Sequence, residues 1–247
     1  MRRNEIIKYI NDYLNSDKIA DSSQNGLQVE GAEEVKKIVF GVSAGAELFN
    51  RAAKSGADMV ITHHGLLWGK NPRVTGVFKK RIEILIKNNI SLAAWHLPLD
   101  LHKTAGNNAQ IAHALGLKNI KPFGEYHGVK IGFAGVLQNG KTTKEIEKML
   151  GLKANTVLPF GPVKNKKIAI ISGGGYSIFE QAADAGYDLF ISGSAEEFVQ
   201  EIAKECKINY MAAGHYNSEK YGVLALMELI SKKFKVETKF IDVGNSI

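Results

Sequence analysis

Two stretches of this chain repeat one another. Residues 36–61 read KKIVFGVSAGAELFNRAAKSGADMVI, and residues 166–191 read KKIAIISGGGYSIFEQAADAGYDLFI. Each copy has the pattern of an apolar strand, a helix and a second apolar strand. Some likeness between two such units arises by chance because core and capping positions converge, but an ungapped alignment of this length favours duplication. The shared positions include Gly45/Gly175, Phe49/Phe179, Ala52/Ala182, Ala53/Ala183, Gly56/Gly186 and Asp58/Asp188.

Strand and helix patterns alternate through most of the remaining chain. The repeat continues into a third strand, since residues 90–95 correspond to residues 208–213. Strands separated by helices pair in parallel through right-handed crossovers. We therefore expect an α/β fold with mainly parallel sheets and internally duplicated domains.

The first strand-helix series ends at 116–122, and the stretch that follows, up to a linker with proline and glycine at 158–166, looks like the start of a second domain. We expect a first α/β domain made of residues 1–124 and about 194–247, which carries the functional site. A second, inserted α/β domain would cover about 125–193. The sequence leaves open whether a strand over 236–243 returns to the first domain.

Histidines and acidic residues stand just beyond the ends of the predicted strands. The carboxyl ends of parallel strands are where α/β sheets bind ligands, and imidazole and carboxylate groups suit divalent metals. The spacing of a histidine followed by an acid four residues later occurs twice, at 96–100 and at 215–219. We expect a centre of two divalent ions, with zinc, iron and manganese all compatible with such ligands. The candidate ligands are His63, His64, Asp100, His215 and Glu219.

Several of these residues have a second interpretation. His96 is a ligand, a support for a ligand or an acid/base group, and we assign it to proton transfer. Asp100 could instead cap a helix beginning near Thr104, and Glu219 could simply favour the positive end of a helix. The turn at 172–175 reads SGGG, which suits either a phosphate-binding loop or a tight structural turn.

Composition sets the broad class of the protein. Of its 247 residues, 45% are hydrophobic and 23% are charged, as in an ordinary soluble globular protein. No segment approaches ~20 uncharged apolar residues, so we expect no membrane span. The single cysteine, Cys206, excludes an internal disulfide and a CxxC metal site, which favours a cytoplasmic protein. The net charge of +7 fits a lysine-rich surface better than a nucleic-acid interface, although anionic substrates stay open.

Four motifs give the chain a specific resemblance to a known family. They are residues 21–29 (DSSQNGLQV), 61–65 (ITHHG), 96–100 (HLPLD) and 214–219 (GHYNSE). In order and spacing the chain resembles, nearly from end to end, the Nif-three-like dinuclear metal-centre family, whose members are often named GTP cyclohydrolase I type 2 homologues. The resemblance implies two interlinked α/β domains, the five metal ligands named above, and a toroidal homohexamer (a trimer of dimers) whose metal sites face an inner cavity. One departure is visible: residues 192–198 read SGSAEEF, from Ser192 to Phe198, where relatives usually carry an acid and a histidine, so no role that needs this histidine carries over.

Three functions are compatible with such a site. The first is a metal-dependent hydrolase that acts on a nucleotide-like, purine nucleotide substrate through a metal-activated water. The second is a non-catalytic metal-binding ring that binds single-stranded nucleic acid or a regulatory protein, although no stretch interleaves aromatic and basic residues as such binding would require. The third is metal storage or sensing without turnover.

Overall fold

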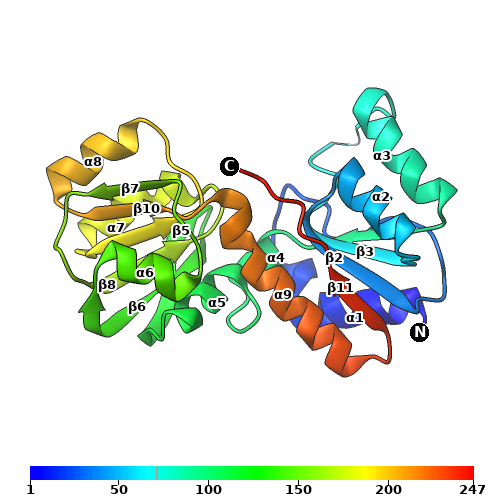
Figure 1. Ribbon diagram of the computed structural model, residues 1–247, viewed down its shortest axis with the longest axis horizontal. Helices are drawn as coiled ribbons and strands as arrows, with labels where there is room; N and C mark the ends of the chain where they lie inside the picture. Colours follow the sequence, from blue (N-terminus) through cyan, green and yellow to red (C-terminus); the bar gives the residue numbers. More distant parts are fainter. Residues whose placement is uncertain (71) are drawn as a thin grey trace. The chain divides into compact units, whose positions relative to one another are not determined.

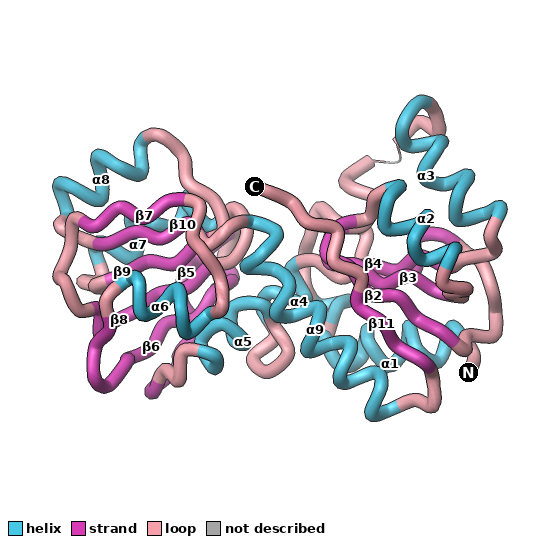
Figure 2. Tube along the Cα trace, viewed as in Figure 1, coloured by secondary structure: helices cyan, strands magenta, loops and turns pink. Residues whose placement is uncertain are grey.

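The computed structural model describes residues 1–70 and 72–247, and they form two compact units (Figures 1 and 2). The first unit consists of Met1–Leu99 and Val223–Gly244, and the second of Asp100–Gly222 and Asn245–Ile247. Each unit has one mixed sheet with a parallel core and flanking helices, which confirms the α/β fold class. Residues 100–124 and 194–222 thus group with the second unit, whereas the sequence placed them in the first domain. The physical reason is that strands within both ranges pair into the second sheet.

The first unit has a five-stranded sheet in the order β1-β4-β3-β2-β11. Neighbouring strands run parallel except for the edge pair β1 and β4. The strands are β1 (Gly26–Val29), β2 (Lys37–Ser43), β3 (Met59–His64), β4 (Ser91–Ala94) and β11 (Glu237–Phe240). The helices before and between them are α1 (Arg3–Leu14), α2 (Ala46–Lys54) and α3 (Gly76–Lys87). Phe49 of α2 and Leu85 of α3 pack with Val39 and Val60 of the sheet in one buried cluster, so these helices cover the same face.

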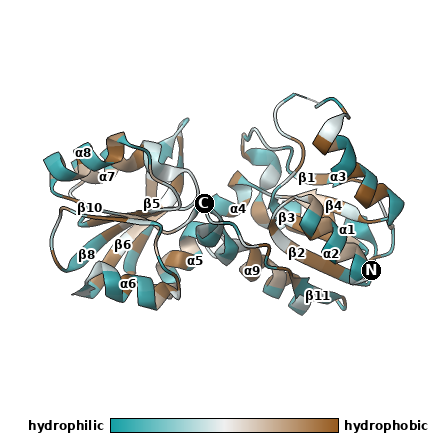
Figure 3. Ribbon diagram, turned by 45° about the horizontal axis from the view of Figure 1, so that its top comes forward, coloured by the Kyte–Doolittle hydropathy of each residue, from teal (hydrophilic) through white to brown (hydrophobic). Residues whose placement is uncertain are grey.

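The second unit has a six-stranded sheet in the order β5-β6-β8-β9-β10-β7. Only the central strands β8, β9 and β10 run parallel, and the outer pairs are antiparallel. The strands are β5 (Lys118–Tyr126), β6 (Val129–Lys141), β7 (Thr156–Pro159), β8 (Asn165–Ile171), β9 (Leu189–Ser192) and β10 (Asn209–Ala212). The helices are α4 (Leu97–Leu101, which begins in the first unit), α5 (Asn107–Ala114), α6 (Thr143–Leu150), α7 (Phe179–Asp184), α8 (Phe198–Cys206) and α9 (His215–Lys233). Figure 3 shows both hydrophilic and hydrophobic residues on α6 and α8, as expected of helices with one side against a sheet.

The two copies of the repeat have the same structure. Strands β2, β3 and β4 correspond to β8, β9 and β10, and Ile38 pairs with Met59 as Ile168 pairs with Leu189. A shared aspartate explains part of the sequence identity. Asp58 accepts hydrogen bonds from the backbone N–H groups of residues 36 and 37 at 2.7 and 2.9 Å. In the second copy, the aspartate at 188 accepts the equivalent bonds from residues 166 and 167 at 2.7 and 2.8 Å. Each carboxylate therefore joins the residue just before one strand to the start of the neighbouring parallel strand.

The C-terminal segment returns to the first unit, which answers the question that the sequence left open. Helix α9 starts in the second unit and continues without interruption into the first, where Val223 begins the returning segment. Strand β11 then adds to the edge of the first sheet, parallel to β2, with Thr238 opposite Ile38. A single unbroken helix therefore carries the chain from one unit to the other.

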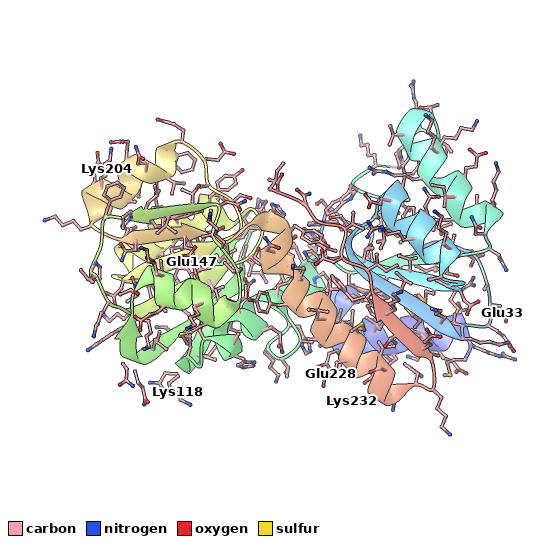
Figure 4. All side chains as sticks on the ribbon, viewed as in Figure 1. Glu33, Lys118, Glu147, Lys204, Glu228 and Lys232 are labelled. Carbon is pink, nitrogen blue, oxygen red and sulfur yellow. The ribbon has the colours of Figure 1, made fainter. Side chains whose placement is uncertain are left out.

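Exposed lysines come from different elements of the fold. Lys118, Lys204 and Lys232 are exposed and come from β5, α8 and α9 (Figure 4). Lys204 pairs with Glu201 at 2.7 Å, one of several exposed pairs on helix surfaces. Among the helices in residues 1–70 and 72–247, none combines the length and the apolar character needed to cross a membrane.

Candidate metal centre

The end of strand β3 presents two adjacent histidines. His63 is fully buried, and its Nδ1 lies 3.0 Å from the carbonyl oxygen of Trp95. Because a carbonyl oxygen only accepts hydrogen bonds, Nδ1 carries the proton and the lone pair is on Nε2, the form that binds metals. The Nδ1 atom of His64 lies 3.2 Å from Oγ of Ser43, at the end of the neighbouring strand β2. Both rings are thus oriented by their Nδ1 atoms.

A third histidine joins this pair. The rings of His63 and His64 lie with their centroids 4.7 Å apart, and His96 is 5.0 and 5.6 Å from them. One nitrogen from each of the three rings lies within 4.8 Å of the other two, which is close enough for a shared cation. The first unit therefore contains a cluster of three imidazoles on its own.

Asp21 fixes the position of His96. Its Oδ1 lies 3.0 Å from Nδ1 of His96, and its Oδ2 accepts the backbone N–H of Leu97 at 2.9 Å. The backbone N–H of His96 in turn donates to Asn25 Oδ1 at 2.8 Å. Burial alone would raise the pKa of Asp21, but the hydrogen bond and charge of His96, together with bonds from Asn25 and the N–H of Ser23, lower the pKa to about 2. Asp21 is therefore a carboxylate at neutral pH, held against the ring that follows strand β4.

The turn after the histidine pair depends on Gln28 of β1. Its Oε1 accepts the backbone N–H groups of Leu66 and Leu67 at 2.7 and 3.2 Å, and its Nε2 donates to the carbonyl of Gln24 at 2.8 Å. A Cβ atom at Gly65 would lie 2.3 Å from Nε2 of Gln28. Glycine follows the histidines because this amide packs against the backbone, a reason that the sequence did not reveal.

In the second unit, Asp100 is buried in α4 and held by two side chains. Its Oδ1 accepts Nδ2 of Asn107 at 2.8 Å and Oγ of Ser172 at 3.2 Å. Helix α5 begins at Asn107 after Gly106, and no side chain caps it. The alternative role of Asp100 as a helix cap is therefore not observed, and its carboxylate is oriented at the loop that follows β8.

His215 is the first residue of α9, and Glu219 follows one turn later on the same face of the helix. Nε2 of His215 lies 3.2 Å from Oε1 of Glu219, whose side chain is 3% exposed. Nδ1 of His215 lies 3.2 Å from Oγ of Ser194. The sequence departure at 192–198 thus supplies a hydroxyl that orients this histidine.

The glycine-rich turn after β8 fits closely against this pair. A Cβ atom at Gly173 would lie 2.3 Å from Oε1 of Glu219 and 3.1 Å from Nε2 of His215, and its φ is +61°. The N–H of Ser172 donates to Asn108 at 2.6 Å, and the N–H of Gly173 donates to Ser218 Oγ at 3.0 Å. Because both N–H groups already donate to protein atoms, neither is available to bind a phosphate. This favours the interpretation of the segment as a tight structural turn.

The predicted residues thus form one set in each unit. His63, His64 and His96 lie together in the first. In the second, Asp100 and the pair of His215 and Glu219 flank the same turn, at Ser172 and Gly173 respectively. Asp21 and Gln28 had no role that the sequence alone revealed, although both lie in the DSSQNGLQV motif that carried the resemblance. The contacts of these two side chains are the structural reason for that motif.

Comparison with known proteins places the chain in a family. The sequence pattern of Duf34/NIF3 (NGG1p interacting factor 3) matches residues 1–246. The chain belongs to this family. A relative from Archaeoglobus fulgidus, named GTP cyclohydrolase 1 type 2 homolog, is 44% identical over 98% of both chains. The family resemblance inferred from the four motifs is confirmed.

Solved structures of family members have the same fold. A protein described as ybgI, of unknown function, is 39% identical and matches with a TM-score of 0.91 over 100% of both chains. TTHA1606 from Thermus thermophilus is 32% identical, again with a TM-score of 0.91 over 100% of both chains. Both sheets and their connections are therefore common to these proteins.

Proposed function

We propose that this Duf34/NIF3 protein is a hydrolase of purine nucleotide-like substrates that uses two divalent cations. The proposed ligands are His63, His64, Asp100, His215 and Glu219. The observation that carries the proposal is the set of three imidazoles in the first unit, with nitrogens within 4.8 Å of one another. Imidazole nitrogens gathered this closely are typical of a cation site, in which we assign His63 and His64 as ligands and place His96 beside them.

The donor atoms fit such cations in two respects. The Nδ1–H of His63 donates to a carbonyl oxygen, so Nε2 is unprotonated, which is the form that binds zinc, iron or manganese. In the second unit, the carboxylate of Glu219 and the ring of His215 lie against Gly173, where any larger residue would displace them. The chain therefore keeps room for an acid and an imidazole at the start of α9.

The residues around the ligands supply the other parts of the chemistry. Two bound cations would polarise the bond under attack and lower the pKa of a water molecule. His96 would move the proton: Asp21 holds its Nδ1–H, so that Nε2 is the atom that accepts and releases the proton. Asn25 and Asp21 both fix the backbone at 96–97, which keeps this ring in place during turnover.

The substrate class is supported by the relatives. Curated relatives from Archaeoglobus fulgidus and Haemophilus influenzae are named GTP cyclohydrolase 1 type 2 homolog, at 44% and 40% identity. For this chain we propose a guanine nucleotide whose imidazole ring is opened by one water molecule, which leaves a formamide, and whose formyl group is released as formate by a second water. The proposal also includes a cytoplasmic homohexamer, a trimer of dimers in a toroid, and light scattering in solution tests it by measuring the mass of the particle.

Metal content and turnover test the proposal together. The purified protein and its His63→Ala and His215→Ala variants are analysed for bound metal and assayed with a nucleotide panel for formate and phosphate release. His113→Ala is the matched control, because this histidine is exposed on α5. We expect about two metal ions per chain, reduced in both ligand variants but not in the control, and turnover that falls with metal content.

The other outcomes identify the alternative functions. Metal binding without turnover, together with tight binding of a single-stranded oligonucleotide, would support the non-catalytic ring. Metal binding with neither activity would support storage or sensing. A chain that binds no metal would refute all three.

His96 is tested separately. We expect His96→Asn to retain metal and lose turnover, because its ring transfers a proton. Loss of metal equal to that of His63→Ala would make His96 a ligand instead.

A further inference from the structure

Trp68 lies beside the histidine cluster and has no role in the chemistry described so far. Its ring centroid is 4.9 Å from that of His96, with an interplanar angle of 71°, and 6.1 Å from that of His64. The side chain is only partly buried, whereas Trp95, the other tryptophan, is fully buried. An aromatic surface thus remains accessible next to two of the three imidazoles.

The indole is held rigidly in this position. Its Nε1–H donates to the carbonyl oxygen of Gly65 at 2.9 Å, which fixes the rotation of the ring. The backbone of Trp68 forms a bridge with Ser23, and the N–H of Gly69 donates to the carbonyl of Ser22. The loop that carries the ring is therefore held by hydrogen bonds of both its side chain and its backbone. The ring thus loses little conformational entropy when a ligand binds to it.

We propose that Trp68 is the binding surface for the purine base of the substrate. A flat heteroaromatic base stacks on a partly exposed indole, and such contacts tolerate any base because every base has a π-face. The contact of Trp68 with His96 places this surface next to the proton-transfer group of the proposed reaction. The purine identity rests on the proposed function, whereas the stacking itself depends only on the position of the indole.

Tryptophan fluorescence measures this binding without turnover. Trp95 is buried and serves as an internal background, so quenching by a guanine nucleotide reports on Trp68. The metal-loaded protein is titrated with GTP and with ribose 5-phosphate, which lacks the base. We expect quenching by GTP alone, and no quenching in Trp68→Phe, where the remaining tryptophan is buried.

Calorimetry on three variants then separates stacking from a structural role. Trp68→Leu should weaken GTP binding roughly 5- to 150-fold, while Trp68→Phe, which keeps an aromatic face, should lose much less. Phe198→Leu is the control, because this exposed aromatic residue lies on α8. Metal content should be unchanged in all three variants.

Three results would overturn the inference. Equal GTP affinity in Trp68→Leu and wild type would show that the base does not stack there, and loss of metal in Trp68→Leu would show that the ring only supports the histidines. Failure of metal-loaded wild type to bind any nucleotide would also overturn it. The hydrolase proposal fails on different evidence, because a protein that binds GTP through Trp68 without releasing formate or phosphate would refute only the proposed reaction.

Discussion

A methyl group at position 173 gives the sharpest test of the ligands proposed in the second unit. In Gly173→Ala the added carbon would lie 2.3 Å from Oε1 of Glu219, where ordinary contact begins at 3.4 Å, so the carboxylate must move by roughly 1 Å. The positive φ of +61° adds strain of about 1–2 kcal/mol for a residue with a Cβ atom. Overpacking against a buried side chain adds about 1–3 kcal/mol. We expect a total cost of about 2–5 kcal/mol together with weaker metal binding.

Gly186 provides the matched control for this experiment. Its φ is +67°, but a Cβ atom there would meet nothing within 4 Å. Gly186→Ala should therefore cost only the strain of about 1–2 kcal/mol and leave metal binding unchanged. The assay is thermal unfolding with and without a chelator, in parallel with metal analysis, and each kcal/mol should lower Tm by roughly 2–4 °C. If the two variants unfold at the same temperature and bind the same amount of metal, Gly173 does not hold Glu219 and His215 in place.

Three further changes test the rest of the centre. Asp21→Asn should loosen His96 and reduce turnover. The folded-state pKa of Asp21, about 2, lies below the ordinary value, so the stability that this carboxylate contributes is present above pH ~4 and is lost as the pH falls toward 2. The acid unfolding curves of the variant and the wild type should therefore converge near pH 2. Gln28→Leu leaves the N–H groups of Leu66 and Leu67 without their acceptor and should lower the unfolding free energy by about 1–3 kcal/mol in urea titrations, and an unchanged midpoint would contradict this. Removal of metal by a chelator should lower Tm of the wild type, because a ligand that binds only the folded state stabilises it, and an unchanged Tm would mean that no such metal is bound.

The repeated core could be predicted because its signals are local. Each copy has buried apolar strands and glycines at turns, and the register that pairs Ile38 with Met59 recurs between Ile168 and Leu189. The aspartates at 58 and 188 were visible as shared residues, yet their bonds to backbone N–H groups at the start of the neighbouring strand depend on the folded structure. Local patterns thus predicted the elements but not the contacts between them.

The returning strand β11 illustrates the limit for the fold. It has four residues, Glu237–Phe240, in an alternating pattern of exposure, and its partner β2 begins at Lys37. A short edge strand carries little intrinsic preference, so its pairing is decided by the tertiary contacts. Residues 100–124 and 194–222 group with the second unit because β5 and β10 pair with strands of its sheet, which are long-range contacts that a local pattern does not contain.

The site shows the same division. His63 and His64 were recognisable because they adjoin a strand end, but the partner of His96 is Asp21, 75 residues earlier in the chain. Gly173 appeared as part of a phosphate-binding loop or a structural turn, and only the distance to Glu219 reveals why a side chain is excluded there. Residue types predicted the candidate metal ligands, whereas the residues that orient them became visible only in the folded chain.

The unbroken helix α9 also limits how this protein can be divided. Because Val223–Gly244 belongs to the first unit, a recombinant fragment that ends at Leu99 would lack β11 and expose the edge of β2. Unpaired strand edges of this kind favour aggregation. Neither half is a contiguous, separately expressible piece of the gene, so insertions or truncations that are harmless in tandem-domain proteins should here compromise both halves at once.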